Sequence, residues 1–192
     1  LSYNGYTRDK SLGLASEHTA FTTTSKIKEG IKHYGYRDTT DKKPLLDYSV
    51  KSVNLQNMEG NQIANNINIT YSASRSTSFT YDSENKVYKR FQNGKEHKDY
   101  VTGKQYTTKN IITYQVANST ISGDAKNRQD IQNITSGTGW YISEGYAVPI
   151  TWEKTSRSAQ TVYKYKDGTK IKVNDGNTYI QIQPLGQNFT IE

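Results

Sequence analysis

The segment Trp152–Thr161 holds the densest set of side chains that could bind a charged or sugar ligand. It follows a predicted strand and contains Lys154, Ser156, Arg157 and Thr161. Arginine offers two parallel N–H donors to a carboxylate or phosphate, and hydroxyl groups add further donors. The sequence therefore predicts a ligand-binding loop with Trp152 at its base. The alternative is a long polar connection whose hydroxyl groups bond to the loop's own backbone.

The three histidines do not share a motif. His18, His33 and His97 are far apart, and none belongs to an HxH or HExxH pattern. His33 lies among the lysines of a predicted helix, and His97 lies in a lysine-rich hairpin. Only His18, next to Glu17 in a loop rich in serine and threonine, is a candidate general base or ligand, although most single loop histidines do no chemistry.

Other catalytic patterns are missing from the sequence. The chain has no cysteine, which excludes disulfides, thiolate catalysis and cysteine zinc sites. It contains neither GxSxG nor SxxK. The Gly137-Thr-Gly139 segment lacks the third glycine of a dinucleotide loop, so we expect a tight bend or a close backbone approach beside Trp140. Trp140 is also a candidate ligand-binding residue.

Acidic residues predict no metal site. Asp124 and Asp130 flank Arg128 but lack the spacing and final glutamate of a calcium loop, so a salt-linked turn is expected. A pair of carboxylates for glycoside hydrolysis stays open, because their separation is a matter of space and not of sequence. The residues therefore name no catalytic group, no metal ligand and no cofactor.

The net charge of +7 suits an anionic partner such as nucleic acid, an anionic membrane or a wall polymer. A solvated surface is the simpler interpretation, since the charges are dispersed and no run of five like charges occurs. In Thr161–Lys166 the tyrosines and lysines alternate. A strand would turn the rings inward and the charges to solvent, which disfavours a nucleic-acid platform.

Turn dipeptides between alternating strands predict the architecture. Asn93-Gly94, Asp167-Gly168 and Asp175-Gly176 separate runs rich in Val, Ile, Thr and Tyr. We predict a mainly β fold (α+β overall): an antiparallel meandering sheet, built as a sandwich or half-barrel. One short helix is expected at about residues 23–34, ending at Gly35.

Two strands have particular expectations. The run 111–117 is apolar on both sides, which predicts a central strand. Pro149 removes an amide donor from the strand around residues 146–153, which predicts an edge position or a bulge.

The chain is expected to have two parts: a loop–helix segment at 1–45 and an antiparallel β domain at 46–192. Only 32% of residues are hydrophobic, but sixteen tyrosines can bury large rings and still satisfy their hydroxyl groups. No run approaches the eighteen apolar residues of a membrane span. The sequence shows no signal peptide and begins at Leu1, so we expect a processed product or an excised fragment.

The region Phe79–Gly186 resembles the carboxy-terminal half of the YerB-like lipoprotein family of Gram-positive bacteria. The resemblance rests on blocks of matching order and spacing: Phe79–Asp82, Tyr88–Lys95, Lys109–Ile112, Asp130-Ile131, Gly137–Gly139, Thr151-Trp152, Lys154, Ser156-Arg157 and Thr178–Ile182. Upstream, Glu17–Thr19 and Thr22–Tyr36 are similar to the end of that family's preceding domain. Phe79 and Tyr179 stand where the family often has tryptophan, which leaves the core intact.

The resemblance implies export and a location at the outer face of the cytoplasmic membrane. Membrane attachment would come from a lipid anchor on a cysteine that this chain lacks, and the preceding domain would be one partner. It brings no established reaction.

Three functions are therefore open. We expect a cell-envelope binding or assembly domain that contacts wall glycan or an anionic polymer. The alternative is part of a wall-modifying enzyme whose site combines His18 and the Arg157 loop with an absent domain. A third is a structural module that orders its partner. A pocket joining His18 to Arg157 would favour the enzyme, whereas a flat or grooved aromatic face would favour binding.

Overall fold

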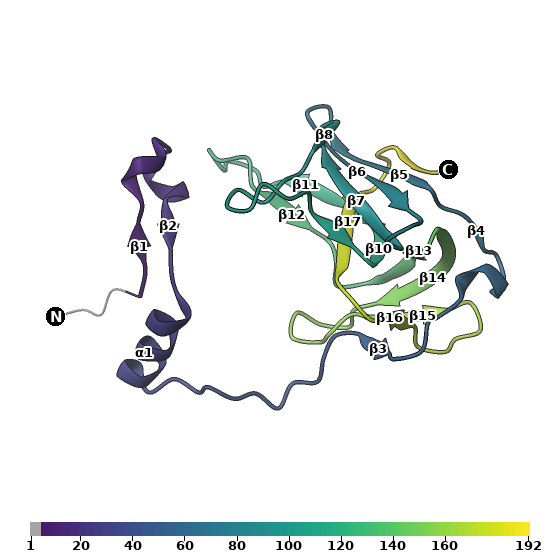
Figure 1. Ribbon diagram of the computed structural model, residues 1–192, viewed down its shortest axis with the longest axis horizontal. Coiled ribbons are helices and arrows are strands. Elements are labelled where there is room, and N and C mark those ends of the chain that lie inside the picture. Colours follow the sequence, from purple (N-terminus) through teal and green to yellow (C-terminus); the bar gives the residue numbers. More distant parts are fainter. Residues whose placement is uncertain (1–4) are drawn as a thin grey trace. The chain divides into compact units, whose positions relative to one another are not determined.

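The computed structural model describes residues 5–192 (Figure 1). The chain forms two compact units, one ending at Lys43 and the other comprising Pro44–Glu192, and each is described by itself. No helix within residues 5–192 is long and apolar enough to span a bilayer.

The first unit contains the one α-helix of the described chain, α1 (Thr24–Tyr34). The Thr23 side chain caps its first turn by accepting from the Lys26 amide, and Gly35 ends it with a left-handed φ of 63°. This confirms the predicted helix. The unit also contains the following short elements: β1 (Thr7–Arg8), η1 (Lys10–Leu12), η2 (Ser16–His18) and β2 (Ala20–Phe21).

The second unit is a sandwich of two six-stranded sheets. Sheet I has the order β18-β5-β6-β7-β8, with β9 also paired to β7. Its strands are β5 (Asn66–Ser72), β6 (Arg75–Asp82), β7 (Val87–Gln92), β8 (Lys95–Glu96), β9 (Thr107–Thr108) and β18 (Phe189–Ile191). Sheet II has the order β15-β14-β13-β10-β17, with β4 also paired to β14. Its strands are β4 (Gln62–Ile63), β10 (Asn110–Val116), β13 (Ser136–Ser143), β14 (Tyr146–Glu153), β15 (Val162–Tyr165) and β17 (Thr178–Pro184).

Smaller elements complete the second unit. They are β3 (Asp47–Ser49), η3 (Leu55–Asn57), β11 (Asn118–Thr120), β12 (Gln129–Ile131) and β16 (Lys172–Asn174). β11 and β12 form a hairpin between β10 and β13, and β3 pairs with β16. Within the hairpin connection Arg128 and Asp124 form an ion pair of 2.6 Å, which is the expected salt-linked turn.

The mainly β prediction is confirmed, and so is the tight turn at Asn93-Gly94. Asp175-Gly176 instead joins β16 to β17, which pair with β3 and β10 and not with each other, so it is not a hairpin turn. Asn93 and Gly94 both have positive φ, 49° and 73°, in the tight turn between β7 and β8. Most pairings are antiparallel, but β10 with β17 and β3 with β16 are parallel. The meander is interrupted at these points because parallel neighbours need a long crossover, which residues 117–177 supply between β10 and β17.

Sheet II is buried on both faces around β10. One face packs on sheet I through Ile111, Ile142 and Ala147. The opposite face packs under the segments that carry β3, η3 and β16, through Ile112, Tyr141 and Val173. Consecutive buried residues such as Ile111 and Ile112 therefore face different cores, as expected for a central strand.

Pro149 lies in a gap on the outer side of β14. β4 pairs with Tyr146 and Ala147, whereas β15 pairs with Ile150–Glu153, so neither strand reaches Pro149. The missing amide donor falls at a position that is locally an edge. The register between β13 and β14 is continuous through this residue, without a bulge.

Candidate functional site

The face of sheet II that looks toward sheet I changes from apolar to polar along its strands. One row across the strands is Ala147, Ile142, Ile111 and Tyr179, and it packs on sheet I. The next row is Pro149, Trp140, Thr113 and Gln181. The third row is Thr151, Thr138, Gln115 and Gln183. Thr138 and Thr151 are exposed, so sheet I no longer covers this end of the face.

A groove of about 1080 Å³ opens at the polar end. Its lining comes from β10, β13 and the turn between β17 and β18, and includes Thr113, Gln115, Thr138, Trp140, Asn188 and Phe189. Gln132, Ile134 and Leu185 also line it. A concave site of this size with a few polar groups is the usual form of a ligand site.

Buried amides hold one wall of the groove in place. The Gln183 side chain is 1% exposed and donates to the carbonyl oxygens of Thr70 and Asn188, at 2.6 and 2.7 Å. Gln115 donates to the Gln183 side-chain oxygen at 2.9 Å and to the Gln187 carbonyl at 2.8 Å. These bonds tie the β17–β18 turn to both sheets, so the wall is formed before any ligand arrives.

The groove is uncharged. Its lining in the described chain contains no Asp, Glu, His, Lys or Arg, and burial raises the pKa of the Tyr114 phenol, which keeps it neutral. The exposed hydroxyl groups of Thr135, Ser136 and Thr138 make no side-chain hydrogen bond within residues 5–192, so they are open to a ligand or to water. The lining supplies amides, hydroxyls and aromatic rings, which suit a neutral polar ligand.

The two tryptophans face opposite sides of sheet II. Trp140 is half-buried, lies on the side of sheet I and borders the groove. Trp152 also borders the groove, but it is 2% exposed, and the centre of its ring lies 4.4 Å from that of Tyr114 in the other core. The Trp152 indole nitrogen is buried and has no partner in the described chain. Trp140 is therefore the ring that a ligand could stack on.

Gly137 and Gly139 permit the close approach that was expected, but their close neighbours are not Trp140. A Cβ atom on Gly137 would lie 3.0 Å from the Trp152 indole nitrogen. One on Gly139 would lie 2.4 Å from the Thr113 carbonyl oxygen. The close approach involves Trp152 and the β10 backbone, because the two glycines face away from Trp140.

The loop after β14 is largely bonded to itself. The Lys154 ammonium donates to the carbonyl oxygens of Arg157, at 3.3 Å, and of Ala159. The Ser156 hydroxyl accepts from the Ala159 amide at 3.1 Å, and Thr161 is half-buried at the end of the loop. Arg157 is exposed. This arrangement has the features of a self-bonded connection, and the role predicted for these residues stays a prediction.

His18 belongs to the first unit. It ends η2, is exposed, and its amide donates to the Ala15 carbonyl at 2.8 Å. The proposed combination with Arg157, which belongs to the second unit, stays a prediction.

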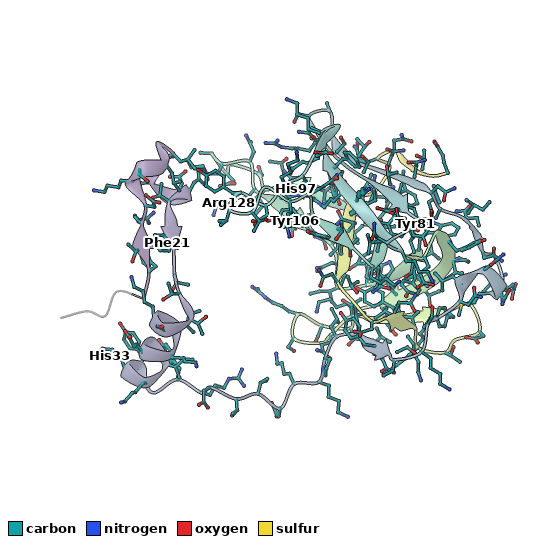
Figure 2. The ribbon with its side chains drawn as sticks, viewed as in Figure 1. Phe21, His33, Tyr81, His97, Tyr106 and Arg128 are labelled. Carbon is teal, nitrogen blue, oxygen red and sulfur yellow. The ribbon has the colours of Figure 1, made fainter. Side chains whose placement is uncertain are left out.

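A second polar cluster lies around Arg90 on the inner face of sheet I, and sequence reasoning missed it. The guanidinium lies 5.2 Å from the Tyr179 ring, donates to Thr77 at 3.3 Å and contacts His97. The Arg90 Nε atom is buried without a partner in the described chain. The rings of His97 and Tyr106 lie 4.8 Å apart (Figure 2). Burial, and then the charge of Arg90, lower the pKa of His97.

One sequence signal could have located Arg90. It stands two residues after Tyr88 on a predicted strand, so both side chains point to the same face. Tyr88 is fully buried, which makes Arg90 an inward cation. Within residues 5–192 no group of three metal-ligating side chains is present.

Comparisons with known proteins agree with this fold. The family model described as the C-terminal domain of a protein of unknown function (DUF3048) matches residues 67–180. The crystal structure of YerB protein from Bacillus subtilis is similar, with 22% sequence identity and a TM-score of 0.74 over 98% of this chain and 61% of that one. The chain thus spans about three fifths of the length of that solved relative. No curated protein matches. Since the family model covers more than half of the sequence, the chain belongs to the YerB-like DUF3048 family, whose function is uncharacterised.

Proposed function

We propose that this chain is a cell-envelope binding domain that holds a neutral glycan strand in the groove between β10, β13 and the β17–β18 turn. The observation that carries the proposal is the composition of the groove, which combines amides, hydroxyl groups and a tryptophan with no Asp, Glu, His, Lys or Arg in its lining. The groove is also open along one side of sheet II, so it can admit a chain and not only a small molecule.

Each part of the lining matches a property of sugars. Free hydroxyl groups at Thr135, Ser136 and Thr138 can donate to and accept from sugar hydroxyls. Trp140 offers a flat apolar surface on which the C–H face of a pyranose ring can rest. The fixed amides of Gln115 and Gln183 keep the wall rigid, which lowers the entropy cost of binding.

The net charge of +7 has a separate role in this proposal. Because the groove is neutral, the positive charges lie outside it, where they attract the domain to an anionic wall without selecting the ligand. An anionic polymer would then bind weakly and lose affinity steeply with salt.

The location is also part of the proposal. The resemblance to YerB-like lipoproteins supports an exported protein at the outer face of the cytoplasmic membrane. Its anchor would lie in a part of the protein outside this chain.

Titration calorimetry of the whole chain with an N-acetylglucosamine hexamer tests the proposal. We expect saturable binding, and Trp140→Ala should weaken it at least about tenfold because the stacking surface is lost. Tyr100→Ala is the matched control: Tyr100 is 86% exposed and does not line the groove, so the loss of its ring should leave the affinity unchanged. Absence of binding at low salt to this hexamer and to glycan strands released from cell walls would refute the proposal.

A further inference from the structure

A second hollow of about 330 Å³ continues the groove across sheet II. It is lined by Thr151, Glu153, Val162 and Lys164, and it shares Ser136, Gly137 and Trp152 with the groove. The two hollows are therefore neighbouring parts of one trough that runs across the strands.

The register of sheet II places the ends of this trough. Lys164 pairs with Thr151, and Thr151 pairs with Thr138, which belongs to the groove. At the other end Gln115 pairs with Gln183. Neighbouring strands lie about 4.8 Å apart, so the five strands from β15 to β17 span about 19 Å. The trough is long enough for several linked sugar rings.

The second hollow differs from the groove in charge. Lys164 is half-buried, Glu153 is exposed, and neither forms an ion pair in the part of the chain that the structure describes. The nearby Lys154 ammonium is already bonded to loop carbonyls. A half-buried lysine side chain that lines a hollow and has no carboxylate partner favours an anionic group from a ligand.

We propose that Lys164 and Glu153 form a subsite for a carboxylate-bearing, peptide-like substituent on the glycan that occupies the groove. Lys164 would bind the carboxylate, and Glu153 would accept an N–H of the same substituent. Glu153 also disfavours simple anions in the hollow. It repels a ligand whose carboxylate is not accompanied by an N–H group that can donate to Glu153. This inference rests on the proposed function and names the class of glycan that the site selects.

The test compares two ligands with the whole chain. One is glycan strands released from cell walls, whose sugars carry carboxylate-containing side chains; the other is the same strands with their carboxylates converted to amides. We expect wild-type protein to bind the acidic strands about tenfold more tightly. Lys164→Gln should abolish this preference and leave the affinity for the amidated strands unchanged.

Lys170→Gln is the matched control, because Lys170 forms a β-bridge with Lys164 and the substitution removes the same charge outside the hollow. It should keep the preference. If wild-type protein binds both ligands equally, or if Lys170→Gln has the same effect as Lys164→Gln, the subsite is refuted while the glycan groove stands. If neither ligand binds, the proposed function fails and the subsite with it.

Discussion

The loop after β14 and the floor of the groove contain similar polar side chains with opposite surroundings. In the loop, Lys154 and Ser156 bond to backbone groups only a few residues away. On the floor, Ser136 and Thr138 stand on a regular strand whose backbone groups are used by the sheet. Their hydroxyl groups therefore stay open to a ligand. The comparison shows that a polar residue is available for binding when its local backbone has no group left to offer.

The groove floor depends on close packing beneath it, and this is where the largest effect is expected. Gly139→Val would place a Cβ atom 2.4 Å from the Thr113 carbonyl oxygen, within the hydrogen-bonded pair of β10 and β13. We expect the free energy of unfolding to fall by about 3 kcal/mol, measured by urea denaturation. Thr138→Val, at the exposed neighbouring position, should change it by less than about 0.5 kcal/mol. If Gly139→Val lowers the free energy of unfolding as little as Thr138→Val does, the groove floor has space beneath it for a side chain.

The availability of hydroxyl groups can be tested by removing them from each region. The double substitution Ser136→Ala with Thr138→Ala should weaken binding of the N-acetylglucosamine hexamer about tenfold, because each lost hydrogen bond contributes about 1 kcal/mol or less. Ser156→Ala with Ser158→Ala removes as many hydroxyl groups from the loop and should leave the affinity unchanged. If the loop variant loses more affinity than the floor variant, the glycan binds at the loop that contains Arg157 and not in the groove.

The smallest expected effect is that of pH. The affinity of the groove should not depend on pH, whereas the stability contributed by the cluster around Arg90 should. Because no side chain in the groove lining changes its charge between about pH 5 and pH 8, glycan affinity should be constant over this range. The free energy of unfolding should instead change over the same pH range. The pKa of His97 lies below its usual 6.5 because of burial and the charge of Arg90.

The direction of this pH effect follows from proton linkage. Between the two pKa values the unfolded chain holds more protons on His97 than the folded chain does, so stability rises with pH. The contribution of neutral His97 to the stability of the folded chain is complete above pH 6.5. It is lost as the pH falls through the lowered pKa that His97 has in the folded chain. His97→Gln should flatten the melting temperature in this range, and an unchanged slope would assign it to other groups.

Local features of the sequence were sufficient to predict the elements but not the site. Asn93-Gly94 and Gly35 act through their own backbone angles, so the β7–β8 turn and the end of α1 could be placed from a few residues. The groove instead requires Thr113, Thr138 and Gln183 to align across strands from distant parts of the chain. It also requires sheet I to stop short of them, and no local pattern reports where one sheet ceases to cover another.

Tryptophan shows the same limit at a single residue type. Trp140 and Trp152 were equal candidates, and strand alternation alone does not say which face meets which core. The pairing of Gly137 with Trp152 places the Trp152 ring over a glycine, and Trp140 falls on the face shared with the groove. Only the assembled sheets distinguish a stacking surface from a packing residue.

The parallel pairing of β10 with β17 has a consequence for how the chain acquires its structure. Asn110 pairs with Thr178, and the two strands stay in register as far as Val116 and Pro184. Contacts between such distant segments slow folding, because a long stretch of chain must be ordered before they form. A nascent chain in which β17 has not yet been synthesised would leave one edge of β10 open to pairing with other molecules. Synthesis of β17 is therefore the step at which this domain gains both its central sheet and its protection against aggregation.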